Sequence, residues 1–124
     1  MSDSVYLDYA ATTPIAPEVF EAMRPYFDSV YGNPSSLHQK GREAKKALQE
    51  AKQKIAACIG AVADEIIFTS GGTEGNNLAV FGVCEAMQSL GKHIITTSIE
   101  HHSVLKACQE LEQKGYEITY RLCM

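Results

Sequence analysis

The sequence predicts an α/β protein in which helices flank a mostly parallel sheet. From Glu65 onward, short β-branched or apolar runs alternate with segments of helical periodicity, in the order β-α-β-α-β. That order favours parallel strands joined by right-handed helical crossovers. A glycine-rich turn at residues 70–76 separates the first strand from the next helix. We expect an extended N-terminal arm at residues 1–16 and an incomplete α/β domain at 17–124.

The segment before the sheet is expected to be helical. Pro17 suits the first turn of a helix, and Pro25 should kink or end it. After a loop at residues 32–36, apolar residues at helical spacing predict an amphipathic helix over 39–59, which Gly60 ends. One of the two serines of the loop is the expected cap of that helix.

Five elements make up the predicted β-α-β-α-β segment. The strands are expected at residues 65–69, 93–97 and 116–122. The helices between them are expected over 73–90 and 103–114, and the glycines that end them are Gly91 and Gly115. In an open parallel sheet, ligands bind outside the carboxyl ends of the strands, so the residues that follow each strand are the candidate site residues.

Composition excludes several classes of function. The 124 residues carry a formal net charge of -4 and no basic stripe, which argues against nucleic acid as a partner. Four cysteines occur without a Cys-x-x-Cys pair or a histidine at metal-ligand spacing, so no metal site is expected. The sequence shows no signal peptide and no apolar run of membrane length, so we expect a cytoplasmic protein without membrane contact.

The turn Ser70-Gly71-Gly72-Thr73 is the strongest candidate for a ligand site. Backbone N–H groups at a helix start, together with the positive end of the helix dipole, suit a phosphate group. No Gly-x-Gly-x-x-Gly or Gly-Lys-Ser/Thr motif is present, so the phosphate is expected on a cofactor other than a nucleotide. Thr73 would hold that phosphate, or would simply cap the helix. The phosphate interpretation requires Glu74 to point away.

His101 is the second candidate. It follows the strand at 93–97, at the same sheet edge as the glycine-rich turn. An imidazole there can stack on a flat cofactor or act as an acid or base, and the alternative is an exposed or capping histidine. Residues 6–13 alternate small and polar groups, which would let the backbone approach a ligand or another subunit closely, or would simply form a surface arm. Asn33 carries no chemical signal of its own.

Four blocks of sequence together resemble the cysteine desulfurase family. They are Tyr-Leu-Asp-Tyr-Ala-Ala-Thr-Thr at residues 6–13, Gly-Asn-Pro-Ser-Ser-x-His-x-x-Gly-Arg at 32–42, Phe-Thr-Ser-Gly-Gly-Thr-Glu-Gly-Asn-Asn-Leu-Ala at 68–79, and Thr-x-x-Glu-His at 97–101. The resemblance covers nearly the whole chain, and the blocks occur in the order and spacing of the family. Each block alone is a weak signal, and their combination is specific.

The resemblance implies a fold-type I enzyme that uses pyridoxal 5'-phosphate (PLP). Such an enzyme moves sulfur from L-cysteine to a protein cysteine, giving a persulfide and L-alanine for iron–sulfur cluster assembly or thiolation. Residues 17–124 would form the first half of its PLP-binding large domain. By resemblance, Gly72 and Thr73 would hold the cofactor phosphate and His101 would stack on the pyridine ring and transfer protons. Ala11, Thr12 and Asn33 would bind substrate, near the partner subunit of a homodimer.

The resemblance also defines what residues 1–124 do not contain. The PLP lysine of the family lies in a later Ser-x-His-Lys motif and its nucleophilic cysteine in a later loop, and nothing here matches either. We therefore expect an N-terminal portion that is inactive alone and needs a complementing C-terminal half. Alternatives are a non-catalytic subunit that dimerises with full-length enzyme, another class V enzyme such as selenocysteine lyase, and a free-standing phosphate- or nucleotide-binding domain. The last lacks a ribose-binding acidic residue after the second strand.

Overall fold

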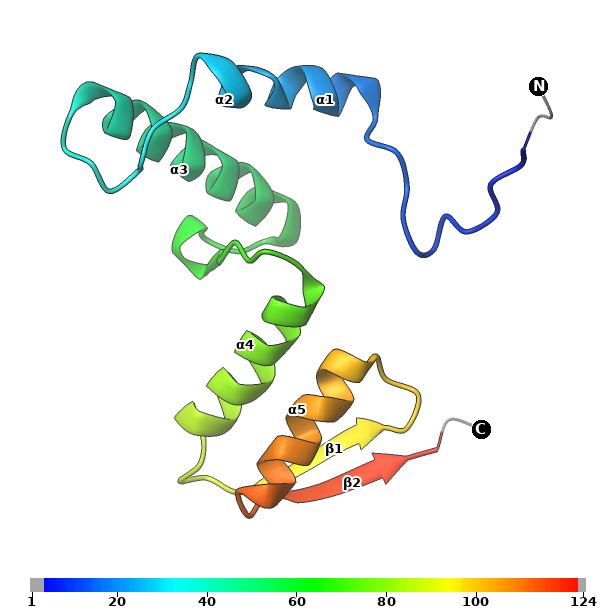
Figure 1. The fold of residues 1–124 in the computed structure, drawn as a ribbon. Coiled ribbons are helices and arrows are strands. Elements are labelled where there is room, and N and C mark those ends of the chain that lie inside the picture. Colours follow the sequence, from blue (N-terminus) through cyan, green and yellow to red (C-terminus); the bar gives the residue numbers. More distant parts are fainter. Residues whose placement is uncertain (1–3, 123–124) are drawn as a thin grey trace. The chain divides into compact units, whose positions relative to one another are not determined.

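The computed structural model describes residues 4–122, and it forms two compact units, one up to Ile66 and one from Ile67 onward (Figure 1). The N-terminal unit contains an irregular arm, three α-helices and a 3₁₀ turn. The C-terminal unit contains two helices and a two-stranded sheet. The predicted division into an arm at 1–16 and a domain from residue 17 stays a prediction, and residues 1–3 and 123–124, including Cys123, lie outside the described range.

Two short helices follow the arm. Helix α1 (Pro17–Met23) has Pro17 in its first turn, and α2 (Pro25–Asp28) begins at the second proline. A proline lacks the N–H that would continue the first helix, so the single helical pattern of the sequence is divided at this point. The predicted kink or short helix is thereby confirmed.

Helix α3 (Gln39–Ile59) has the predicted bounds, and Gly60 ends it in the left-handed conformation with φ of 70°. Its cap is His38, whose side chain accepts a hydrogen bond from the Gly41 N–H at 3.3 Å. The prediction of a serine cap is wrong. Ser35 and Ser36 belong to a turn in which their N–H groups bond to the side chain and the carbonyl of Asn33, each at 2.9 Å.

The predicted strand at residues 65–69 is absent from the structure. Ala63–Glu65 form the 3₁₀ turn η1, and the next residue, Ile66, is extended with φ -93° and ψ 121°. In the described part of the chain, no strand pairs with this segment. The prediction is wrong because an apolar, extended sequence becomes a strand only when a neighbour supplies the hydrogen-bond ladder.

The C-terminal unit is a β-α-β crossover with one additional helix. Strands β1 (His93–Thr97) and β2 (Glu117–Arg121) pair in parallel, with His93 opposite Glu117 and Thr97 opposite Arg121. Helix α5 (His102–Gln113) connects them and lies over the sheet, and α4 (Gly72–Ala86) packs beside α5 (Figure 1). The predicted α/β class with parallel strands is confirmed.

The core of this unit lies along one face of α5. Its buried residues are Ser103, Ala107, Cys108 and Leu111. Burial raises the pKa of the Cys108 thiol, with smaller contributions from Cys84 and Glu100. Tyr116 adds a tie to α4 because its hydroxyl donates to the Cys84 carbonyl at 2.8 Å. The packing of α5 therefore fixes the position of α4 as well as that of the sheet.

Replacing Gly41 by alanine tests the contact between the 32–38 loop and α3. An added Cβ would collide with the Ser36 carbonyl oxygen. We expect G41A to lower the free energy of unfolding by about 1–3 kcal/mol, the usual cost of overpacking. Urea denaturation followed by circular dichroism measures it. G82A is the control, because a Cβ there meets nothing within 4 Å, and it should instead stabilise by about 0.5–1 kcal/mol.

Candidate functional site

The first turn of α4 offers free backbone donors over open space. Gly71 is the N-cap and the helix begins at Gly72, so Thr73 is a residue of the first turn and not the cap. The first N–H groups of a helix have no partner within it, and the helix dipole is positive at this end. A Cβ added at Gly71 or Gly72 would meet no atom within 4 Å. The turn can therefore receive an anion that approaches the backbone closely.

Glu74 lies in the same turn, and its carboxylate is bonded to Ser70. Its Oε2 accepts hydrogen bonds from the Ser70 N–H at 2.7 Å and from the Ser70 hydroxyl at 2.6 Å. The hydroxyl bond first, and then the backbone bond, lower the pKa of this carboxyl. Within residues 4–122, no hydrogen bond joins this carboxylate to the N–H of Gly72 or Thr73. Those two donors remain available to a ligand.

His101 caps helix α5. Strand β1 ends at Thr97, whose hydroxyl donates to Glu100 at 2.8 Å and so closes the turn that follows the strand. The next residue, His101, accepts at Nδ1 a hydrogen bond from the Ser103 N–H at 3.1 Å. The capping histidine that the sequence offered as an alternative is thus present. The side chain is still exposed, so its other ring nitrogen can meet a ligand.

A hydrogen-bonded chain connects His101 to α4. The Asn76 side-chain amide donates to the Ser103 hydroxyl at 2.8 Å, and that hydroxyl lies 2.8 Å from His101 Nδ1. Asn76 is in the first half of α4, and His101 and Ser103 are at the start of α5. The structure therefore brings His101 and the glycine-rich turn to the same end of the helix pair, as the sequence predicts.

Sequence reasoning missed Ser103 and the role of Asn76. Their side chains meet across a separation of 27 residues, and no spacing rule predicts such a contact. The available signal was chemical: a serine at a helix start and an asparagine within a helix both seek partners close to the backbone. Neither tendency predicts that these two side chains form a hydrogen bond with each other.

The predicted substrate residues Ala11, Thr12 and Asn33 are exposed and lie in the N-terminal unit. The N–H groups of Ala11 and Thr12 bond to the Asp8 carbonyl, at 3.1 and 3.4 Å, in a local turn. Asn33 organises its own loop through its bonds to the two serines. Their roles toward a substrate stay predictions.

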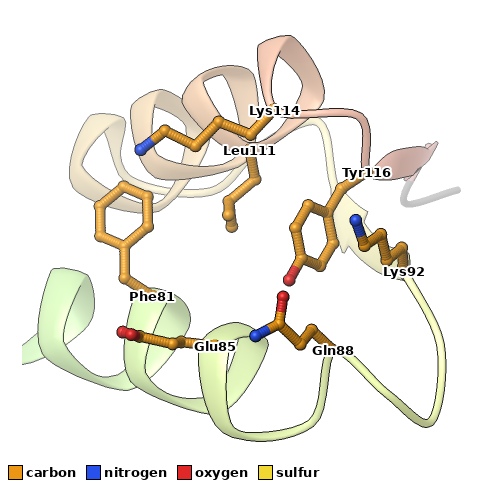
Figure 2. Close-up of a pocket in the computed structure, with 7 residues that line it drawn as sticks. All are labelled: Phe81, Glu85, Gln88, Lys92, Leu111, Lys114 and Tyr116. Carbon is orange, nitrogen blue, oxygen red and sulfur yellow. The ribbon is translucent and has the colours of Figure 1, made fainter.

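A separate cavity of about 370 Å³ lies toward the C-terminal ends of α4 and α5 (Figure 2). Its lining residues are Phe81, Glu85, Gln88, Lys92, Leu111, Lys114 and Tyr116. The Lys114 ammonium lies 5.5 Å from the centre of the Phe81 ring, and the Lys92 ammonium lies 5.7 Å from that of Tyr116. The lining comes from the helix ends opposite to Gly72 and His101, so this cavity is not part of the candidate site.

Residues 4–122 also bear on metal binding and membrane insertion. No group of three or more His, Cys, Asp or Glu side chains within residues 4–122 is arranged to hold a metal ion. Over the same range, no helix has the length and apolar character needed to cross a bilayer.

The comparison with known families agrees with this fold. The profile of the family described as Aminotransferase class-V matches residues 5–122, and the chain therefore belongs to that family. The resemblance to cysteine desulfurases that the four sequence blocks carry is also confirmed, since curated cysteine desulfurases are among the matching relatives.

Two of these relatives are similar over nearly all of this chain. The cysteine desulfurase IscS of Dictyoglomus turgidum is 59% identical over 120 residues, which are 97% of this chain and 30% of the relative. The putative cysteine desulfurase IscS 1 of Bacillus subtilis is 55% identical over 118 residues, 95% of this chain and 31% of that protein. The chain thus spans about a third of the length of the curated relatives it matches.

Solved structures give the same result for the fold. A NifS-like protein superposes with a TM-score of 0.87 at 39% identity, covering 94% of this chain and 32% of that one. The structure described as SspA in complex with cysteine superposes with a TM-score of 0.85 at 42% identity, covering 94% of this chain and 34% of that one. The chain therefore has an α/β fold, and it is the fold of the cysteine desulfurases.

Acidification should weaken the structure around the glycine-rich turn through Glu74. Its folded pKa lies below the ordinary value of 4.5, so its stabilising bonds to Ser70 are present above that pH and lost as pH falls through the folded pKa. We expect the difference in unfolding free energy between the parent and E74A to shrink as pH falls below 4.5. Urea titrations at a series of pH values measure it.

Glu85 provides the matched control for this titration, because it is an acidic residue of the same helix that lies outside the glycine-rich turn. The loss of stabilisation at low pH should be larger for the comparison with E74A than for the comparison with E85A. An equal response of the two variants to pH would show that Glu74 does not hold the turn.

Proposed function

We propose that this chain supplies the phosphate-binding and ring-facing part of a PLP-dependent cysteine desulfurase. The reaction would transfer sulfur from L-cysteine to a cysteine of a protein acceptor, leaving a persulfide and L-alanine, in support of iron–sulfur cluster assembly or thiolation. One observation carries the proposal: α4 begins with free backbone N–H groups over open space, and Asn76 of the same helix is hydrogen-bonded through Ser103 to the imidazole of His101.

The residues present fit the phosphate of PLP. The N–H groups of Gly72 and Thr73 and the Thr73 hydroxyl would hold the phosphate oxygens, because charge-assisted hydrogen bonds to a dianion are strong at a helix start. The missing side chain of Gly72 lets the anion approach the backbone. PLP, when bound, supplies an electron sink for bonds at the substrate amino acid.

His101 would face the cofactor ring and handle a proton. Its Nδ1 is engaged by the Ser103 N–H, so the proton of the neutral ring lies at Nε2. An exposed Nε2–H would donate a hydrogen bond, or its proton, to a group of the cofactor or substrate. Both the orientation and the tautomer of the ring are set by residues of α5 and α4.

The substrate, partners and location are part of the same proposal. One structural neighbour is described in complex with cysteine, which supports L-cysteine as substrate. Ala11, Thr12 and Asn33 would contribute to the substrate site within a homodimer, as in the resembling family. Cys58, Cys84 and Cys108 are free thiols in the described range, in keeping with the reducing conditions of a cytoplasmic protein.

The lysine that binds PLP covalently and the nucleophilic cysteine belong to motifs that residues 1–124 do not contain. We propose that these motifs act together with this segment, in a longer form of the protein or in a complementing chain. The alternative is a non-catalytic subunit that pairs with a complete enzyme. The two differ in whether a complementing C-terminal half restores sulfide release.

Replacing Thr73 by valine tests the phosphate site. We expect T73V to weaken PLP binding by about 1–2 kcal/mol, from the loss of one charge-assisted hydrogen bond. Titration of the 124-residue chain with PLP, and competition by inorganic phosphate, measure the change. No borohydride-trapped adduct and no sulfide release from cysteine are expected without a complementing half.

The matched control is T119V, which removes a strand hydroxyl bonded to His93 at 2.8 Å and lies outside the turn. It should bind PLP as the parent does. Equal binding by T73V and T119V would remove Thr73 from the site, and sulfide release by the isolated chain would refute the need for the missing motifs.

A further inference from the structure

The surroundings of His101 Nδ1 determine where the ring carries its proton. The backbone N–H of Ser103 is a donor that cannot reverse, and it points at Nδ1 from 3.1 Å. Nδ1 must therefore present its lone pair, and the neutral ring holds its proton at Nε2. A proton at Nδ1 would face the Ser103 N–H and lose this bond. The start of α5 thus selects one tautomer.

The Ser103 hydroxyl adds a second partner to the same nitrogen. Asn76 donates to Ser103 Oγ at 2.8 Å, so the hydroxyl proton is free to point at Nδ1, which is also 2.8 Å away. Ser103 is only 7% exposed, and no solvent shell competes strongly for its hydroxyl. A buried hydroxyl that accepts a hydrogen bond from Asn76 and donates one to His101 couples the positions of these two side chains.

We propose that Ser103 and Asn76 are positioning residues for His101. Asn76 on α4 fixes the Ser103 hydroxyl on α5, and that hydroxyl, with the backbone N–H, fixes the plane and tautomer of the imidazole. The pair links the ring to the helix whose first turn holds Gly72 and Thr73. The value of this link to the reaction rests on the proposed function, whereas the link itself does not.

The neighbouring side chains leave this role to Ser103 and Asn76. Glu100 is engaged by the Thr97 hydroxyl, and the His102 ring centre lies 6.3 Å from that of His101 with the planes tilted by 59°. Neither contact engages Nδ1. Among the described residues, the hydrogen bonds of His101 side-chain nitrogen atoms all go to Ser103.

The test is a double-mutant cycle read by nitrogen NMR of the 124-residue chain with ¹⁵N-labelled histidine, without PLP. In the parent, His101 should show an unprotonated Nδ1 and a protonated Nε2. N76A should shift the Nδ1 signal, although the Asn76 amide is hydrogen-bonded to Ser103 and not to the ring. In the S103A background, N76A should have no further effect, so S103A and the double variant should show the same Nδ1 chemical shift. S103T, which keeps a hydroxyl, should restore the response to N76A.

T119V is the matched control, because it removes the hydroxyl partner of His93. It should move the His93 signals and leave those of His101 in place. A protonated Nδ1 or an averaged tautomer mixture at His101 in the parent refutes the proposal. So does an N76A shift of equal size with and without the Ser103 hydroxyl. The NMR samples contain no PLP, so their result does not depend on cofactor binding. A failure of the chain to bind PLP would refute the proposed function and would leave the tautomer result unaffected.

Discussion

The hydrogen bond between Asn76 and Ser103 holds the parts of the candidate site together. The glycine-rich turn belongs to α4 and His101 to α5, and the start of each helix would be free to move without a tie between them. The bond lies at a half-buried to buried position, where loss of either partner leaves a polar group without compensation. The site therefore depends on the packing of α4 against α5, and that packing depends on the buried face of α5.

The Glu74 carboxylate at the start of α4 has hydrogen-bond partners within its own turn before any ligand arrives. Glu74 would oppose an incoming phosphate, but its carboxylate is bonded to the N–H and hydroxyl of Ser70. The same bonds stabilise the turn, since an acidic side chain near a helix start interacts favourably with the dipole. Glu74 thus stabilises the conformation of the turn, and the N–H groups of Gly72 and Thr73 stay available to a ligand. A neutral residue would remove the repulsion and also the bonds that define the turn.

Local patterns in the sequence predicted the elements that depend on local interactions. The predicted bounds of α3 and β1 agree with the structure to the residue. Helical periodicity and a following glycine define α3, and a run of β-branched residues defines β1. The strand at 65–69 failed because its ladder needs a neighbour that sequence cannot display. The helix predicted over 73–90 ends at Ala86, where a turn between Met87 and Leu90 replaces the last helical bonds. The candidate site follows the same division: Gly72, Thr73 and His101 were visible from motif and position, whereas Ser103 emerged only from the packing.

The origin of the convergence at this site is topological. A helix that follows the glycine turn and a helix that follows β1 both start near the same edge of an α/β layer, so their positive ends point to one region. That region attracts anions in general and selects none of them. Selection requires groups of fixed direction, and in the proposed site these would be the Thr73 hydroxyl and the imidazole of His101. The fold would then supply attraction, whereas the hydrogen-bonded set of Asn76, Ser103 and His101 would supply the direction that binding of a specific cofactor requires.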